Sequence, residues 1–176
     1  YWFLQPGGNL EKLPSIETDR MESLVAQKLT RLADDVRSNP DDANAWGLLG
    51  MNFQVHGFAQ EAFSCLAEAH KLAPNAFAWT YYYALGKRDL GEEEAITWFE
   101  KAAQVNGAHA PLYVHLGELH LKLNQQDRAE QAFQQALSIN PKLSHAHLGL
   151  AKVARMQNRI STCLLYTSPS PRDSIA

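Results

Sequence analysis

The chain has 176 residues, of which 45% are hydrophobic and 20% charged, so it can bury one core of ordinary size and is neither disordered nor fibrous. A formal net charge of -3 leaves no excess of Lys and Arg to neutralise phosphates, so we expect no binding to nucleic acid. The two cysteines, Cys65 and Cys163, are too few and too far apart for a disulfide framework or a thiolate metal site.

Residues 1–18 are predicted to be a leader or linker, since they show little hydrophobic periodicity and contain two prolines. Tyr1, Trp2 and Phe3 begin the chain without an initiator Met, so we expect the native start to lie upstream. Two interpretations stay open: a flexible leader with incidental aromatic residues, or the interfacial end of a membrane anchor that precedes Tyr1. The localisation stays open between the bacterial cytoplasm and a membrane-anchored periplasmic position. The sequence itself contains no apolar run near the ~18 residues that a membrane span needs.

Residues 19–38 are predicted to form an amphipathic helix. Apolar residues recur there at spacings typical of one helix face, namely Met21, Leu24, Val25, Leu29, Leu32 and Val36. Asn39 and Pro40 end the helix, because a residue that precedes proline is displaced from the α region. A single amphipathic helix cannot bury its apolar stripe alone, so we expect it to cap the helices that follow.

Residues 43–75 carry the pattern of two antiparallel helices joined by a tight turn. Asp42 can cap the first helix through its carboxylate, and Trp46 begins the buried face. Gly57 ends this helix, because glycine most readily adopts the left-handed conformation at a helix end. The second helix carries apolar residues at helical spacing and ends before Pro74.

The same pattern recurs along the chain at intervals of 33 or 34 residues. Residues that tolerate positive φ mark the turns: Gly57, Gly91, Asn124 and Asn158. Small residues mark the first helices: Gly50, Ala84, Gly117 and Ala151. The second helices share Ala62, Ala95 and Ala129. Such periodicity predicts stacked repeats, each of them one helix pair.

The repeated unit resembles the tetratricopeptide repeat, whose characteristic positions are matched by Trp46, Leu49, Gly50, Ala62 and Pro74. The resemblance implies an all-α fold, a right-handed α-solenoid of antiparallel helix pairs over residues 39–162. The expected repeats are about 43–75, 76–108, 110–142 and a partial fourth at 144–162. Gly50 opposite Ala62 would let two helix backbones approach closely, which offsets the ~1 kcal/mol that glycine costs inside a helix.

The second repeat departs from the family pattern. Trp79 stands one position early, and Lys87 occupies a position where the family usually has an aromatic residue. The spacings of the turn residues and of the alanines place a one-residue deletion between Gly91 and Ala95. We therefore expect this repeat to have a shortened turn and a first helix whose rotation is not determined by the pattern.

The resemblance also implies a concave groove, lined by the first helices, in which such proteins receive ligands. The matching partner-binding positions are Met51, Gln54, Tyr81, Leu85, Arg88, Val114, Glu118, Leu148, Lys152 and Arg155. Their apolar members would form an adaptable floor, with Tyr81 as an aromatic platform. Arg88, Lys152 and Arg155 add positive charge, which favours a protein or peptide ligand with acidic and apolar groups. The alternative is that these are ordinary solvated charges.

The candidate catalytic and metal-binding patterns do not hold. The segment HLGELH invites comparison with the HExxH zinc motif, but five residues turn a helix by about 500° and leave the His115 and His120 imidazoles roughly 140° apart. Cys65 lacks a basic neighbour at helical spacing that would lower its pKa, so we expect a buried structural thiol. No nucleophile, base and orienting group assemble, so we expect no enzymatic activity, metal or cofactor in these residues.

We therefore predict a non-catalytic scaffold that binds a partner protein or peptide in its groove. Two alternatives stay open: the substrate-recognition arm of a larger enzyme such as a glycosyltransferase, or a bacterial envelope assembly factor of the cytochrome c maturation type. The two-carboxylate clamp of chaperone-binding family members is not supported. Gly47 and Met51 stand where that clamp would need polar or basic groups.

Residues 163–176 are expected not to be native. Cys163–Asp173 read CLLYTSPSPRD, and a back-translation of these residues resembles a transposase adapter used in sequencing libraries. The alternative is a genuine Ser/Pro-rich tail that is disordered or binds a proline-recognition domain. These residues therefore contribute nothing to the predicted fold.

Overall fold

The described structure consists of one short 3-10 helix and eight α-helices. The computed structural model describes residues 10–15, 22–91 and 93–167, with side chains up to residue 157. Within these ranges there is no strand, which confirms the all-α fold. The elements are η1 (Leu10–Lys12), α1 (Ser23–Ser38), α2 (Ala43–Val55), α3 (Ala59–Leu72), α4 (Phe77–Asp89), α5 (Ala95–Val105), α6 (Ala110–Lys122), α7 (Gln126–Ile139) and α8 (Ser144–Thr167). They belong to two compact units, residues 1–106 and 107–176.

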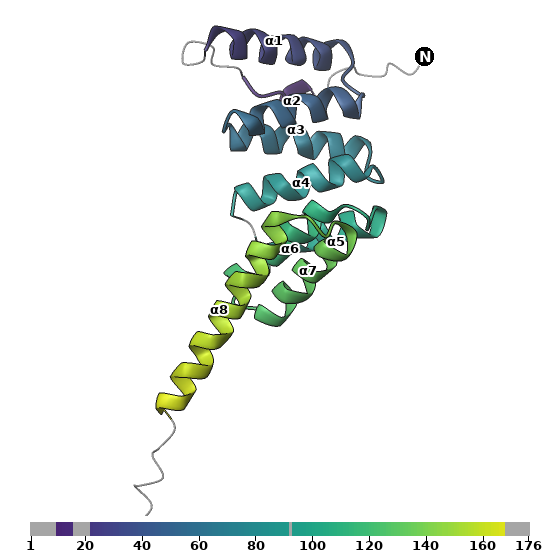
Figure 1. Cartoon of the computed structure of the whole chain (residues 1–176). Coiled ribbons are helices and arrows are strands. Elements are labelled where there is room, and N and C mark those ends of the chain that lie inside the picture. The colour runs from purple at the N-terminus through teal and green to yellow at the C-terminus, as the bar shows by residue number, and fades with distance from the viewer. Residues whose placement is uncertain (1–9, 16–21, 92, 168–176) are drawn as a thin grey trace, which may run out of the picture. The chain divides into compact units, whose positions relative to one another are not determined.

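The first unit is a stack of helices in which each helix from α1 to α5 packs against the next one in the chain (Figure 1). Trp46, Leu49 and Phe53 of α2 lie in the centre of its apolar core, as the repeat pattern predicts. Leu29 and Val36 of α1 are fully buried in the same core, as expected of a capping helix.

The buried face of α1 differs in part from the predicted stripe. Leu24 is 70% exposed, because the buried residues of this helix follow a face made by Ala26, Leu29, Ala33 and Val36. The described helix begins at Ser23, and the predicted stripe residue Met21 lies outside the described residues.

Close approach of α2 and α3 depends on a missing side chain. A Cβ atom added at Gly50 would lie 2.7 Å from Leu66 Cγ and 3.1 Å from the carbonyl oxygen of Ala62. Both distances are shorter than ordinary van der Waals contacts, so the two helices approach as closely as the sequence predicts.

Phe133 organises the second unit, in which α6, α7 and α8 pack against one another. Its side chain is fully buried on α7. Cβ atoms added at Gly117 of α6 and Gly149 of α8 would lie 2.6 and 2.4 Å from its ring. The ring therefore packs directly against the backbones of both neighbouring helices.

The predicted helix ends are present at most of the expected positions. Asp42 caps α2, where its carboxylate accepts a hydrogen bond from the backbone N–H of Asn44 at 2.8 Å. Gly57, Gly91 and Asn124 have φ values of 82°, 79° and 56°, so the three turns use the residue types that tolerate the left-handed region.

A recurrent hydrogen bond ties three first helices to the turns that precede them. In each case a side chain in the first turn of the helix bonds to the carbonyl oxygen of a proline six residues earlier, which the repeat pattern places after the preceding helix. The pairs are Trp46 Nε1 to Pro40 O at 2.8 Å, Thr80 Oγ1 to Pro74 O at 3.3 Å, and His147 Nε2 to Pro141 O at 2.9 Å. The same helix position thus brings an indole, a hydroxyl or an imidazole within hydrogen-bond distance of the proline carbonyl oxygen, and the Thr80 hydroxyl also lies 3.1 Å from the carbonyl oxygen of Ala76.

The prediction of a shortened turn in the second repeat is wrong. The connection between α4 and α5 comprises residues 90–94, whereas α2 and α3 are joined by residues 56–58. Helices α3 and α7 begin three residues before their matching alanines, but α5 begins at Ala95 itself. Since Ala95, Phe99 and Ala102 are fully buried, packing holds them in register, and the deletion removes the first turn of α5 instead.

The predicted turn at Asn158 does not form, because α8 continues as one helix from Ser144 to Thr167. The chain from residue 150 to residue 168 contains neither glycine nor proline, and no described helix follows that could pack against a turn. Ala151, expected at a buried small-residue position, is accordingly exposed.

We predict that Gly50→Leu destabilises the protein by about 1–3 kcal/mol, because the new side chain would overlap Leu66 and the backbone of α3. Urea unfolding would measure the change. Leu48→Ala on the same helix is the control: Leu48 is 47% exposed, and its truncation should change stability by less than ~0.5 kcal/mol. Equal stability of Gly50→Leu and the unmodified chain would contradict the packing.

Candidate partner-binding faces

The predicted groove residues of the first unit lie on α2 and α4, which contact each other. Met51 is partly buried against the apolar core. Gln54 Nε2 donates to Asp89 Oδ2 at 2.7 Å, and Arg88 donates to Asp89 Oδ1 through Nε at 2.9 Å and through a terminal nitrogen at 2.7 Å. The carboxylate of Asp89 therefore links the two helices and partly neutralises Arg88.

Tyr81 and Leu85 form packed parts of this face, since each is 8% exposed. The Tyr81 ring stacks on Phe77 at 5.6 Å between centroids and meets the edge of Phe99 at 5.9 Å. Burial, together with the neighbouring Tyr82, raises the pKa of Tyr81 to about 12 despite the opposing charge of Arg88, so its hydroxyl stays protonated. Tyr81 is therefore not the open aromatic platform that the sequence suggested.

Gly47 shows why α2 and α4 lie so close together. A Cβ atom at this position would lie 2.2 Å from the Trp79 indole, so the indole covers the glycine. Trp79, whose position in the repeat departs from the family pattern, is 8% exposed and packs in the core of the first unit. Gly47 is thus a packing residue and offers no side chain to a ligand.

The predicted groove residues of the second unit lie on α6 and α8, and they differ strongly in exposure. Val114 is 5% exposed, and the Glu118 carboxylate lies 3.6 Å from His115 Nδ1. On α8, Leu148 is 55% exposed, and Lys152 and Arg155 are exposed as well. These three residues follow one another at spacings of four and three, which places them on one helix face. Neither cation pairs with a carboxylate among the described residues.

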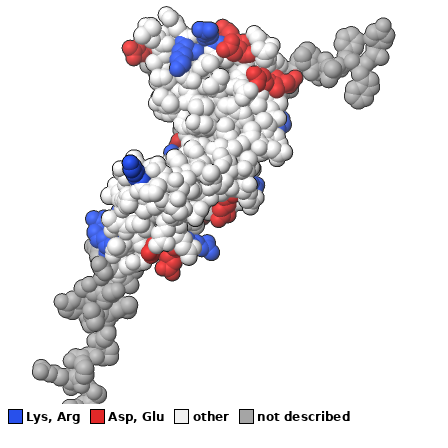
Figure 2. All heavy atoms as spheres, turned by 45° about the vertical axis from the view of Figure 1, so that its right-hand side comes forward, with Lys and Arg blue, Asp and Glu red and all other residues white. Residues whose placement is uncertain are grey.

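Charged side chains lie in small groups of both signs on the face drawn in Figure 2, among the residues that the structure describes. No continuous basic surface of the kind that a phosphate backbone needs is present in that view. Among the described residues, no helix is long and apolar enough to cross a membrane.

The His and Cys residues that resemble catalytic or metal-binding patterns are buried or contact other side chains. His120 is 7% exposed and its Nδ1 lies 2.8 Å from Gln125 Oε1, whereas His115 faces Glu118. Burial raises the pKa of the Cys65 thiol to about 12, and the nearby Glu61 acts in the same direction, so the thiol is protonated and inert. The described part of the chain contains no group of three or more His, Cys, Asp or Glu residues that could hold a metal ion.

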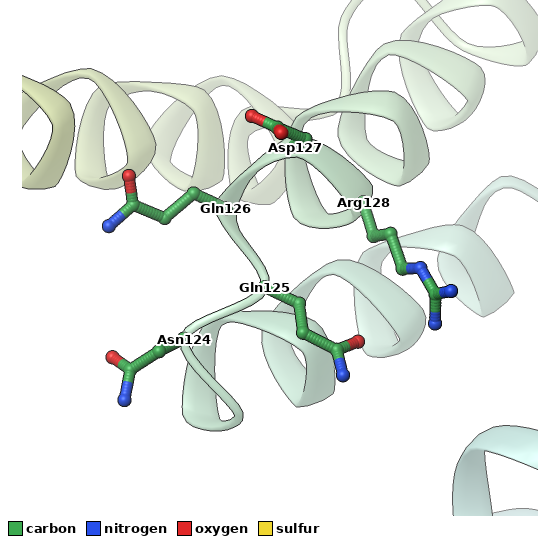
Figure 3. Close-up of a pocket in the computed structure, with 5 residues that line it drawn as sticks. All are labelled: Asn124, Gln125, Gln126, Asp127 and Arg128. Carbon is green, nitrogen blue, oxygen red and sulfur yellow. The ribbon is translucent and has the colours of Figure 1, made fainter.

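A hollow of about 560 Å³ lies at the turn between α6 and α7 and is lined by the five consecutive residues Asn124, Gln125, Gln126, Asp127 and Arg128. Figure 3 shows that Asn124 and Gln126 point to one side of the turn while Arg128 points to the other. The polar groups therefore diverge, and they do not surround a common point at which a substrate could react.

An aromatic cluster that the repeat pattern does not predict joins α3, α4 and α5. Between ring centroids, Tyr83 stacks on Phe63 at 5.2 Å and on His70 at 5.3 Å, and it lies 4.7 Å from Trp98 in a T-shaped arrangement. Lys87 replaces the usual aromatic residue here: its Nζ lies 5.5 Å from the Phe63 ring centre, 5.6 Å from that of Tyr83 and 3.1 Å from Glu94 Oε2. The one feature of the sequence that pointed to this cluster was Lys87, which stands where the family usually has an aromatic residue.

Burial in this cluster lowers the pKa of His70 below its ordinary value of 6.5, and the nearby charge of Lys101 lowers it further. Below pH 6.5 the unfolded chain therefore binds this proton more readily than the folded chain does. The contribution of neutral His70 to stability is complete above that pH and is lost as the pH falls through the lowered pKa.

We predict that His70→Phe, which keeps an aromatic ring but cannot titrate, weakens the pH dependence of stability. Its free energy of unfolding should fall less than that of the unmodified chain between about pH 7.5 and pH 5.5, as urea titrations would measure. His145→Phe replaces an exposed imidazole and serves as the control. An unchanged pH dependence in His70→Phe would show that His70 does not carry the effect.

Comparison with known proteins gives a family match for one repeat of the sequence and a shared fold for most of the chain. The sequence profile of the tetratricopeptide repeat matches residues 110–143, which include the third predicted repeat. Anaphase-promoting complex subunit 3 of Schizosaccharomyces pombe is 30% identical over 110 residues, or 61% of this chain and 16% of that protein. Cellulose synthase operon protein C of Escherichia coli is 30% identical over 127 residues, or 72% of this chain and 9% of that protein. The chain thus spans a small part of the length of these relatives.

Solved structures share the fold at lower identity. MamA aligns with a TM-score of 0.69 at 18% identity, over 78% of this chain and 86% of that one. A tetratricopeptide repeat protein from Parabacteroides merdae aligns with a TM-score of 0.69 at 24% identity, over 77% and 54%. The first such domain of Spaghetti (RPAP3), bound to the HSP90 peptide SRMEEVD, aligns with a TM-score of 0.63 at 18% identity, over 66% and 94%. The alignments confirm the helical-repeat solenoid class.

Proposed function

Because the chain is a tetratricopeptide repeat protein, we propose that it is a non-catalytic scaffold that binds a peptide or partner protein on the faces of its first helices. The observation that carries this proposal is the exposed face of α8. Leu148, Lys152 and Arg155 lie there side by side, and no described residue neutralises the two cations. A solvated apolar residue flanked by free cations suits a ligand that offers both an apolar group and a carboxylate.

The remaining predicted residues would serve the same ligand in a different way. In the first unit, Met51, Tyr81 and Leu85 are mostly packed and would form a shaped apolar floor. A ligand carboxylate could reach the guanidinium of Arg88 only in competition with Asp89. We therefore assign the first unit the weaker role in attracting acidic groups.

Two further predicted positions lie on α6, a helix that contacts α8. Val114 is buried and would support the floor, whereas Glu118 is partly exposed and adds a negative charge. A carboxylate on the neighbouring helix disfavours a ligand that is uniformly acidic. We infer a ligand in which acidic groups are separated by apolar ones.

The related proteins support this choice of ligand. The RPAP3 domain of similar fold was solved with the peptide SRMEEVD, which has three acidic side chains and two apolar ones. Anaphase-promoting complex subunit 3 is by name a component of a larger assembly. Both cases are consistent with binding of a protein or peptide, and neither identifies the partner of this chain.

One alternative concerns the whole protein. The similarity to cellulose synthase operon protein C, of which the chain covers 9%, supports the idea that these repeats are the recognition arm of a larger polysaccharide-synthesising system or envelope assembly. The complete open reading frame separates the alternatives, because a catalytic domain in the same frame would favour the recognition arm of an enzyme and a membrane anchor would favour the envelope factor.

We predict that a phage-displayed random peptide library enriches peptides with alternating acidic and apolar residues on the immobilised chain. Lys152→Glu combined with Arg155→Glu should weaken a selected peptide at least about tenfold in fluorescence anisotropy, because two attractive charges become repulsive. Arg128→Glu with Lys142→Glu changes the net charge equally at other exposed positions and is the matched control. Equal loss in both double variants would mean that only overall charge matters, and no enrichment would contradict the proposal.

A further inference from the structure

A short segment near the N-terminus is docked on the first unit. The leader was predicted to be a linker, but η1 forms a single 3-10 turn that lies close to α1 in Figure 1. Leu10 and Leu13 pack against the apolar core, and Lys12 Nζ donates to Glu68 Oε1 on α3, 56 residues further along the chain. The segment therefore contacts the body of the unit through two leucines and one ammonium group.

The turn has a geometry suited to this contact. The Leu13 N–H donates to the Leu10 carbonyl oxygen at 3.1 Å, and residues three apart in a 3-10 turn lie on the same side. Both leucines are partly buried, whereas Glu11 is exposed. The sequence Leu-Glu-Lys-Leu thus presents its two apolar side chains to one surface, with the lysine beside them.

Glu68 of α3 is the residue of the first unit that pairs with Lys12. Its side chain is 3% exposed, and its Oε2 atom accepts no hydrogen bond from any described residue. Lys71 Nζ lies 3.6 Å from Oε2, and its own side chain is 62% exposed. A buried carboxylate is costly unless a cation is hydrogen-bonded to it, so the Lys12 ammonium supplies the interaction that this site requires.

We propose that the surface around Glu68 is a second docking site, for a partner segment with a lysine between two leucines in one helical turn, and that residues 10–13 of the chain fill it in the absence of that partner. The site belongs to α3, a second helix, and so is separate from the first-helix faces considered above. The lysine binds the buried carboxylate, and the leucines cover the apolar surface beside it.

A partner segment could displace residues 10–13 from the Glu68 surface because their contact is small. It uses three side chains, and the Lys12 side chain remains 52% exposed in the docked state. A segment of the same chain has an effective concentration on the order of millimolar, so a partner segment must compete with it. Binding of a partner would then release the N-terminal segment.

A direct test uses a fluorescent synthetic peptide with the chain's own residues 8–16, GNLEKLPSI. Lys12→Glu in the full chain should release the docked segment, and the peptide should then bind saturably, at least tenfold more tightly than to the unmodified chain. Adding Glu68→Gln to Lys12→Glu should remove that binding. Lys28→Glu makes the same change in net charge at an exposed position of α1 and should behave as the unmodified chain does.

Hydrogen exchange on the unmodified chain gives a second readout that does not depend on a variant. Millimolar GNLEKLPSI should accelerate exchange of the Leu13 amide, whereas the peptide with glutamate in place of lysine should not. Equal peptide binding by the unmodified and Lys12→Glu chains, binding that survives Glu68→Gln, or unchanged Leu13 exchange would each overturn the proposal. The residues of the α8 face take no part in this experiment, so its outcome is independent of the proposed function.

Discussion

Direct contact between side chains and glycine backbones is the constraint on which this structure depends. Gly50 allows α2 to approach Leu66 and the backbone of α3, and Gly117 and Gly149 hold the two sides of the Phe133 ring. Because protein interiors are close-packed, even one added carbon at these positions would force the helices apart. The spacing of the helix pairs in turn decides which residues of each first helix face outward.

Departures from the repeat pattern are compensated locally. Lys87 replaces an aromatic residue, and its ammonium group lies near the Phe63 and Tyr83 rings and is paired with Glu94. Thr80 stands where the first repeat has an indole, and its hydroxyl lies within hydrogen-bond distance of the carbonyl oxygens of Pro74 and Ala76. Buried polar groups persist here because each has a partner that replaces the lost water.

The three surfaces considered as binding sites differ in which charged groups they leave without a partner. On the α2 and α4 face, Asp89 already pairs with Gln54 and Arg88, so little charge is left to attract a partner. On α8, Lys152 and Arg155 project into solvent. At Glu68 the unsatisfied group is an anion, and the chain's own lysine neutralises it. We therefore propose acidic segments as ligands of the α8 face and basic segments as ligands of the Glu68 surface.

The sequence by itself determined the three complete helix pairs, because turn residues and small residues that recur at intervals of 33 or 34 residues mark repeated units. It also identified the cap at Asp42 and the close approach at Gly50. The positions of the candidate site residues were implied by the resemblance to the tetratricopeptide repeat, and helical spacing placed each set on one face. These properties depend on neighbours in sequence, which is why a repeat pattern reveals them.

Only the tertiary structure decided how far each of these residues is exposed. Tyr81 became buried through Phe77 and Phe99, and the deletion in the second repeat removed a helical turn because the buried alanines stayed in register. The contact between Lys12 and Glu68 joins residues 56 positions apart, and no local pattern indicates it. Exposure and ion pairing depend on which helices meet in space, and that is settled by packing across the whole unit.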